Sequence, residues 1–168
     1  DMRDYINDFV KKENGGGQCV DMLRYYLTQI APETKDSEFT WKGYQDAVNN
    51  ELVNNLANFV NRVVVLTHKF YGGKVPKFDE STEFTGPEDQ YEDSYHDSEL
   101  LRLYDDIYEV TQSIREYKFK DALKGVMEIS SKGNQILQFN EPWKTIKDEP
   151  ERVRAVMNLV LQYTAALR

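Results

Sequence analysis

Apolar residues recur every three or four positions along most of the chain, which is the spacing of a helix with one buried face. The longest such stretch runs from Trp41 to about Tyr71, with Thr40 as a suitable N-cap and a glycine pair at 72–73 as a stop. Its roughly thirty residues predict a helix on the order of 45 Å long, the size of a bundle helix or coiled-coil arm. The predicted buried stripe is Val48, Leu52, Phe59, Val63, Leu66 and Phe70, with Leu56 beside it.

Three further long helices are predicted after this one. The same spacing covers residues 98–117 and 119–139, and we expect Gly133 to interrupt the second of these. Asp148 as N-cap and Pro150 in the first turn start a last helix, whose apolar spacing continues to the end of the sequence without a cap. We therefore expect the bundle to lack its final helix.

Two short amphipathic segments, 1–12 and 19–28, precede the long helix, and no segment has the alternating pattern of a strand. A glycine run at 15–17 ends the first segment. It is no phosphate loop, because no Lys-Ser/Thr pair follows it. The expected fold is all-α, with four main helices preceded by two short ones.

Composition fits one globular domain or a domain with part of a neighbour. The 168 residues are 40% hydrophobic and include 19 Phe and Tyr, so they can bury a core. The chain has no apolar run near 18 residues and no signal peptide, so we expect no membrane. A single cysteine, Cys19, excludes an internal disulfide and fits a cytoplasmic protein. The start at Asp1 is typical of a fragment.

Negative charge is concentrated in one segment. Residues 72–99 carry nine acids and two lysines, a net of -7 out of -8 for the chain, together with Pro76, Gly86 and Pro87 and no apolar period. This pattern predicts an exposed, solvating acidic loop over 72–97, with docking of a partner as the alternative. The remainder is almost neutral, so the overall charge does not exclude a nucleic-acid partner.

Catalytic and metal-binding patterns are missing from the sequence. His68 and His96 with one cysteine cannot supply a typical zinc site, and there is no HExxH, GxSxG or Walker motif. We interpret His96 as a solvated histidine of the acidic loop. No catalytic residues and no metal ligands are predicted, so the function must come from recognition.

A polar column is predicted along the long helix. Asn58, Arg62 and Lys69 are spaced i, i+4 and i+11, within about 40° of one another on the helix surface and beside the apolar stripe. An Asn can read a base edge, and an Arg can pair with a base or phosphate. The alternative is that these are ordinary solvated residues.

Trp143 follows Pro142 in the turn before the last helix. A large aromatic there is either a lid over the core or an exposed stacking platform for unpaired bases. The residues alone leave both possibilities open.

Three segments carry a family resemblance. They are residues 21–36 (DMLRYYLTQIAPETKD), 39–73 (FTWKGYQDAVNNELVNNLANFVNRVVVLTHKFYGG) and 117–144 (YKFKDALKGVMEISSKGNQILQFNEPWK). They resemble methionyl-tRNA synthetases where the class I catalytic half joins the anticodon-binding helical domain. The resemblance implies that 1–40 is the end of the stem-contact fold region and 41–168 the anticodon-binding bundle. Class I synthetases for Ile, Val, Leu and Cys share this bundle and are the nearest alternatives.

The same resemblance implies a set of RNA-binding residues. Asn58, Arg62 and Trp143 match the residues with which the family reads the CAU anticodon, Trp143 by stacking on the cytosine. Lys69 matches a position that is often basic, and Pro142 the proline that sets the tryptophan turn. The implied partner is the tRNA(Met) anticodon stem-loop.

The implied parent is a methionine-tRNA ligase of protein biosynthesis, which charges tRNA(Met) with methionine using ATP and magnesium, with zinc an optional metal. This chain lacks the ATP-binding signature, the zinc knuckle, the KMSKS loop and the terminal helix of the family. We therefore expect it to bind no cofactor, to work with its own catalytic domain, and to be inactive alone. A helical protein-interaction bundle is the alternative from a different class.

Overall fold

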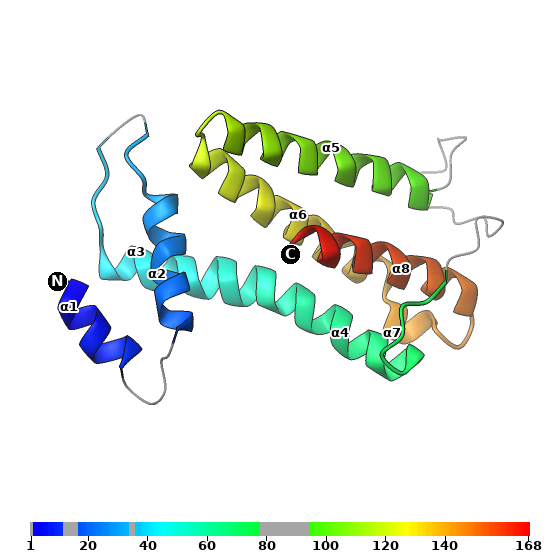
Figure 1. The fold of residues 1–168 in the computed structure, drawn as a ribbon. Coiled ribbons are helices and arrows are strands. Elements are labelled where there is room, and N and C mark those ends of the chain that lie inside the picture. Colours follow the sequence, from blue (N-terminus) through cyan, green and yellow to red (C-terminus); the bar gives the residue numbers. More distant parts are fainter. Residues whose placement is uncertain (1, 12–16, 34–35, 78–94) are drawn as a thin grey trace.

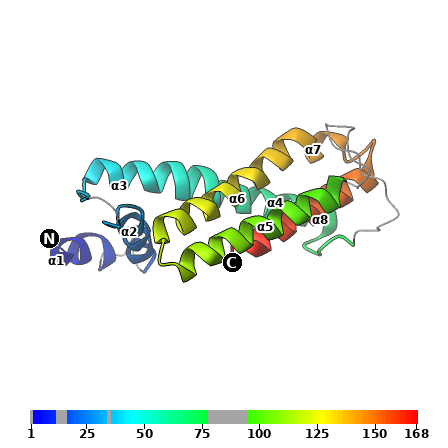
Figure 2. The same ribbon diagram turned by 90° about the horizontal axis from the view of Figure 1, so that it is seen from above.

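A computed structural model describes residues 2–11, 17–33, 36–77 and 95–168 (Figure 1). In these residues the fold is all-α, as the sequence predicts. A long helical rod crosses a group of three antiparallel helices, and a short helical region covers the far end of the rod (Figures 1 and 2). The elements are α1 (Met2–Tyr5), η1 (Ile6–Val10), α2 (Gln18–Gln29), α3 (Trp41–Ala47), η2 (Val48–Ala57), α4 (Asn58–Tyr71), α5 (Tyr95–Arg115), α6 (Phe119–Asn140), α7 (Pro142–Thr145) and α8 (Pro150–Ala166).

The long helix has the predicted ends. Thr40 Oγ1 accepts a hydrogen bond from the Gly43 N–H at 3.0 Å, and Gly72 and Gly73 adopt left-handed φ values of 60° and 79°. Its middle ten residues, η2, are π-helical, which the sequence did not predict. The wider turn keeps apolar residues on roughly one side, so their spacing does not distinguish it from an α-helix.

The core lies where α4, α5, α6 and α8 meet. The predicted stripe is buried at Phe59, Val63 and Leu66, whereas Val48 and Leu52 on η2 are only half-buried. The other buried residues of this core cluster come from the antiparallel helices: Leu103, Ile129, Ile136, Leu137, Val153, Ala155, Val156, Met157, Leu159, Val160 and Tyr163.

The predicted interruption at Gly133 is wrong, because α6 continues through it. A Cβ at this position would lie 2.3 Å from Cζ of the buried Phe59 ring. Glycine is therefore required here by the close approach of α6 to α4, and it does not end the helix.

One predicted helix boundary and the burial expected of one apolar residue also need correction. α8 begins with Pro150 as expected, but its N-cap residue is Glu149 instead of Asp148, and no side chain caps it. Near the turn between α5 and α6, Ile114 follows the apolar spacing of the helix predicted over 98–117 but is 51% exposed, since the tip of this hairpin extends past the end of α8 (Figure 1).

The acidic segment ends earlier than predicted, because α5 already includes Tyr95–Asp97. His96 is 3% exposed, so its interpretation as a solvated histidine is wrong. Its Nε2 lies 3.4 Å from Asn158 Oδ1 on α8, and Asn158 Nδ2 donates to the Pro76 carbonyl at 2.9 Å. The imidazole faces α8 because it lies on the inner side of the first turn of α5. The predicted loop residues 78–94 lie outside the described part of the chain.

The region before Trp41 docks onto the bundle through polar contacts. The Tyr25 hydroxyl and Gln29 Nε2 both donate to the Glu51 carboxylate on η2, the second at 2.7 Å. Burial and the hydrogen bond to Glu51 raise the pKa of the Tyr25 phenol. Glu33 Oε1 accepts from the Lys120 N–H at 3.0 Å and so caps the start of α6. These contacts fix α2 and the segment after it relative to η2 and α6.

Among the described residues, no helix has the length and apolar character needed to span a membrane.

Candidate nucleic-acid interface

An open polar depression lies where η2, α4 and α6 meet. It has a volume of about 440 Å³, and six of its eight lining side chains are amides. Arg62 is the single cation in the lining, and no carboxylate contributes. The lining residues are Asn54, Asn55, Asn58, Arg62, Ser131, Asn134, Gln135 and Gln138.

Two of the predicted site residues, Asn58 and Arg62, lie together in this depression. Both are in the first two turns of α4, where α-helical geometry places residues four apart on the same side. Asn58 is exposed and Arg62 is half-buried. The spacing argument therefore identified this pair correctly as neighbours on an accessible surface.

The Arg62 guanidinium is held by neutral groups. Nη1 donates to Asn134 Oδ1 at 3.3 Å and Nη2 to Gln138 Oε1 at 3.5 Å, both on α6. Its Cζ lies 5.2 Å from the centroid of the Trp143 ring, a cation–π contact. These partners orient the guanidinium without cancelling its charge, so it is prepared to meet an anion or a base edge.

Trp143 lies between the two possibilities that the sequence left open, because it is neither fully buried nor fully exposed. Its side chain is half-buried and packs against the hydrophobic core, and its ring also contacts Arg62 at the surface. Pro142 is buried and is the first residue of α7. The preceding residue, Glu141, has φ +40°, a left-handed conformation that reverses the chain after α6. This sharp turn brings the indole back beside α4.

Lys69 lies apart from the other predicted residues. It is in the last turn of α4 and exposed, seven residues and about 10 Å of helix beyond Arg62. Its Nζ lies 5.6 Å from the Phe70 ring, and it does not line the depression. The three residues predicted to form one column therefore do not all lie together: Asn58 and Arg62 are a pair, and Lys69 is separate from them.

Asn134 and Asn55 are site residues that the sequence reasoning missed. Asn134 Nδ2 donates to the Asn55 carbonyl at 3.2 Å, and Asn55 Nδ2 donates to the Met127 carbonyl and to Ser131 Oγ, both at 2.9 Å. These bonds join η2 to α6. They also hold Asn134, which accepts a hydrogen bond from Arg62. The signal was present as polar residues spaced i, i+3, i+4 and i+7 along 131–138, which gives one helix face.

The chemistry of the depression is that of hydrogen-bond recognition. Amide side chains offer donors and acceptors that match base edges, and an arginine pairs with bases and phosphates. Among the described residues, no group of three or more His, Cys, Asp or Glu side chains could hold a metal ion. The arrangement suits binding of unpaired nucleotides.

Comparison with known proteins gives a consistent result. The family profile for class I tRNA synthetases (M) matches residues 9–64. The methionine-tRNA ligase of Flavobacterium johnsoniae is 43% identical over 166 residues, covering 99% of this chain and 21% of the ligase. That of Phocaeicola vulgatus is 41% identical over 167 residues, covering 99% of this chain and 22% of the ligase.

A solved structure has the same fold. The Mycobacterium tuberculosis methionyl-tRNA synthetase in complex with methionyl-adenylate matches with a TM-score of 0.75 at 17% identity, covering 99% of this chain and 30% of that one. The chain spans about a fifth of the length of the curated relatives that it matches.

Proposed function

Since the chain belongs to the methionyl-tRNA synthetase family, we propose that it binds the anticodon stem-loop of tRNA(Met) and reads the CAU anticodon at the amide-lined depression. The observation that carries this proposal is the Arg62 guanidinium, held between two amides of α6 and the Trp143 ring. Proteins read unpaired RNA bases with groups of this kind, by stacking and by hydrogen bonds to base edges.

Stacking of a base on Trp143 requires an exchange at the ring. The guanidinium of Arg62 occupies one place over the indole, 5.2 Å from its centroid. A base that takes this place replaces one π contact with another and releases Arg62 to pair with a base edge or a phosphate. Asn58, exposed one turn away, then supplies a donor and an acceptor for a neighbouring base.

The proposed role in the whole protein is indirect. The relatives are methionine-tRNA ligases about five times as long as this chain. We propose that the chain holds the anticodon end of tRNA(Met), so that the acceptor end reaches a catalytic part elsewhere in a cytoplasmic ligase. ATP and magnesium, with zinc as an optional metal, serve the chemistry in that part. This chain contributes binding and orientation.

The proposal is tested by titrating the 168-residue chain with two RNA hairpins at low salt. The hairpins share one stem and a seven-nucleotide loop, and differ only in CAU or its permutation UAC at the anticodon positions. One well-made set of base-edge contacts discriminates by about tenfold, so we expect the CAU hairpin to bind at least about ten times more tightly. Equal dissociation constants for the two hairpins would rule out anticodon reading by this chain.

A further inference from the structure

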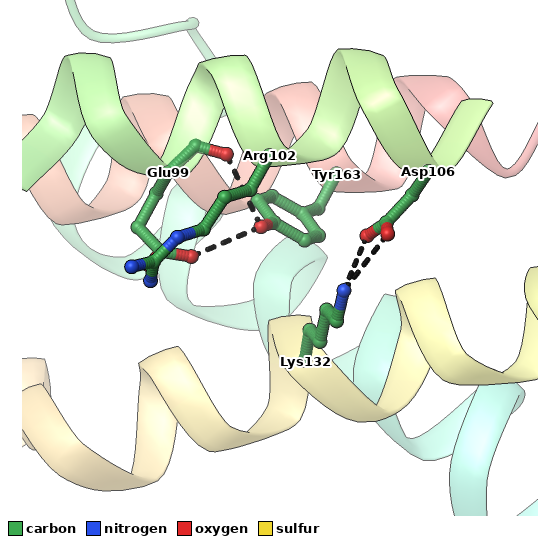
Figure 3. A network of polar contacts seen from close by, with 5 residues as sticks. All are labelled: Glu99, Arg102, Asp106, Lys132 and Tyr163. Carbon is green, nitrogen blue, oxygen red and sulfur yellow. Dashed lines mark hydrogen bonds and ion pairs between the residues drawn. The ribbon is translucent and has the colours of Figure 1, made fainter. Parts of the chain in front are cut away.

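A second depression lies on the other side of α6, between α5 and α6. Its volume is about 350 Å³, and it shares Gln135 with the amide-lined depression, so the two adjoin across the surface of α6. Figure 3 shows the polar network that includes Glu99, Arg102 and Lys132 of its lining. It is lined by Glu99, Arg102, Lys132, Gln135, Ile136 and Phe139.

The charges in this depression are layered. Arg102 Nη1 pairs with Glu99 Oε1 at 2.6 Å, and the side chains are 59% and 10% exposed. Lys132 Nζ pairs with Asp106 Oδ2 at 2.7 Å, and these side chains are 43% and 22% exposed. In both pairs the cation is the more exposed member, so the positive groups face solvent more than the carboxylates do. Figure 3 shows how the two pairs lie.

The inner layer is hydrogen-bonded to the core. The hydroxyl of Tyr163, which is fully buried, lies 3.2 Å from Glu99 Oε2 and donates to that carboxylate. A charge-assisted bond to a buried phenol restricts the carboxylate, and the carboxylate in turn orients Arg102. Arg102 is therefore paired with a carboxylate that is itself hydrogen-bonded to the core.

An exposed aromatic ring completes the surface. Phe139 is 51% exposed and lies four residues after Gln135 and seven after Lys132, so all three share one face of α6. A phenyl ring beside cations is the combination that binds single-stranded nucleic acid, since the ring stacks a base and the cations meet its phosphates.

We propose that this depression is a second RNA subsite, which takes an unpaired loop nucleotide next to those held at the amide-lined depression. The base stacks on Phe139, and its phosphate faces Arg102 and Lys132. The loop crosses α6 over Gln135, a helix width of about 10 Å. This inference rests on the proposed binding of the anticodon loop. Because a phenyl ring stacks on any base, the subsite adds affinity without sequence preference.

The test is the same two-hairpin titration with Phe139→Leu, which keeps an apolar side chain and removes the stacking surface. The matched control is Phe119→Leu, at the other end of α6 and 43% exposed. We expect Phe139→Leu to weaken binding of both hairpins by about fivefold or more, with the ratio between them unchanged. The control should bind both hairpins as the unmutated chain does.

A second pair of variants tests the phosphate contact. Lys132→Gln should reduce the slope of log K against log salt concentration by about 0.7 to 1. The control Lys124→Gln removes a lysine of the same helix that is also ion-paired, to Glu128, and should leave the slope unchanged.

The subsite is refuted if Phe139→Leu binds both hairpins as tightly as Phe119→Leu does, or if the Lys132 and Lys124 variants have equal slopes. A different result overturns the proposed function: equal binding of the two hairpins by the unmutated chain. Absence of any binding to either hairpin by the folded, unmutated chain overturns both.

Discussion

Replacement of Trp143 by alanine is expected to abolish the preference of the chain for the CAU hairpin over the permuted one. The change removes the stacking surface and also the ring that holds the Arg62 guanidinium at 5.2 Å. Loss of one stacked base costs about 1 to 3 kcal/mol, so affinity for the CAU hairpin should fall by about 5-fold to 150-fold. The hairpin titration at low salt measures both effects.

A matched control separates recognition from folding, because Trp143 also packs against the core. Trp41, the other tryptophan, is 57% exposed at the far end of the long helix, and Trp41→Ala should keep the preference. Circular dichroism and thermal unfolding of both variants establish that they are folded under the titration conditions. A folded Trp143→Ala variant that still prefers the CAU hairpin would contradict the proposed role of the indole.

Arg62→Lys provides a version of the test that leaves the core intact. Lysine keeps the positive charge but lacks the planar fork that meets Asn134, Gln138 and the indole ring. We expect the preference for the CAU hairpin to be lost while the salt dependence of binding is retained. A variant with unchanged preference would show that Arg62 acts only as a charge.

The second large effect is expected at Gly133, where Gly133→Val should lower the free energy of unfolding by about 3 kcal/mol. A Cβ at this position would lie 2.3, 2.6 and 2.8 Å from three atoms of the Phe59 ring, which has no exposed surface. The ring cannot move aside in a packed core, so α6 must shift away from α4. Urea denaturation of the variant and the unmutated chain measures the difference.

A double variant checks whether the contact with the Phe59 ring causes the loss of stability in Gly133→Val. Phe59→Ala opens space beside Gly133, so the Phe59→Ala/Gly133→Val chain should be less destabilised than the two single changes added together. Gly17→Val is the matched control, since a Cβ there meets nothing within 4 Å. Simple additivity of the two changes would show that the contact between Gly133 and Phe59 does not determine the helix spacing.

Local sequence signals predicted most of the fold. Apolar spacing, Thr40 and the pair at 72–73 located the long helix and its ends, because each of these acts within a few residues. The burial of His96 and the continuity of α6 at Gly133 depend on partners on other helices. The π-helical turns of η2 escaped detection because their apolar spacing stays close to that of an α-helix.

The site was predicted in part for the same reason. Asn58 and Arg62 are neighbours on one helix, so their spacing alone brought them together. Asn134 and Gln138 contact Arg62 from α6. They lie 72 and 76 positions after it in the sequence, so no local pattern reveals these contacts. The resemblance to the family pointed to Trp143, and the cation–π contact with Arg62 places this half-buried indole beside the amide-lined depression.

The most direct measurement uses the two indole N–H signals of the chain, from Trp41 and Trp143, in a ¹H–¹⁵N spectrum. The variant Trp41→Phe assigns them. On addition of the CAU hairpin, the Trp143 signal should shift until binding saturates, while the Trp41 signal stays in place, and the permuted hairpin should cause a smaller shift at equal concentration. A Trp143 signal that stays unchanged at saturation with the CAU hairpin would contradict the account.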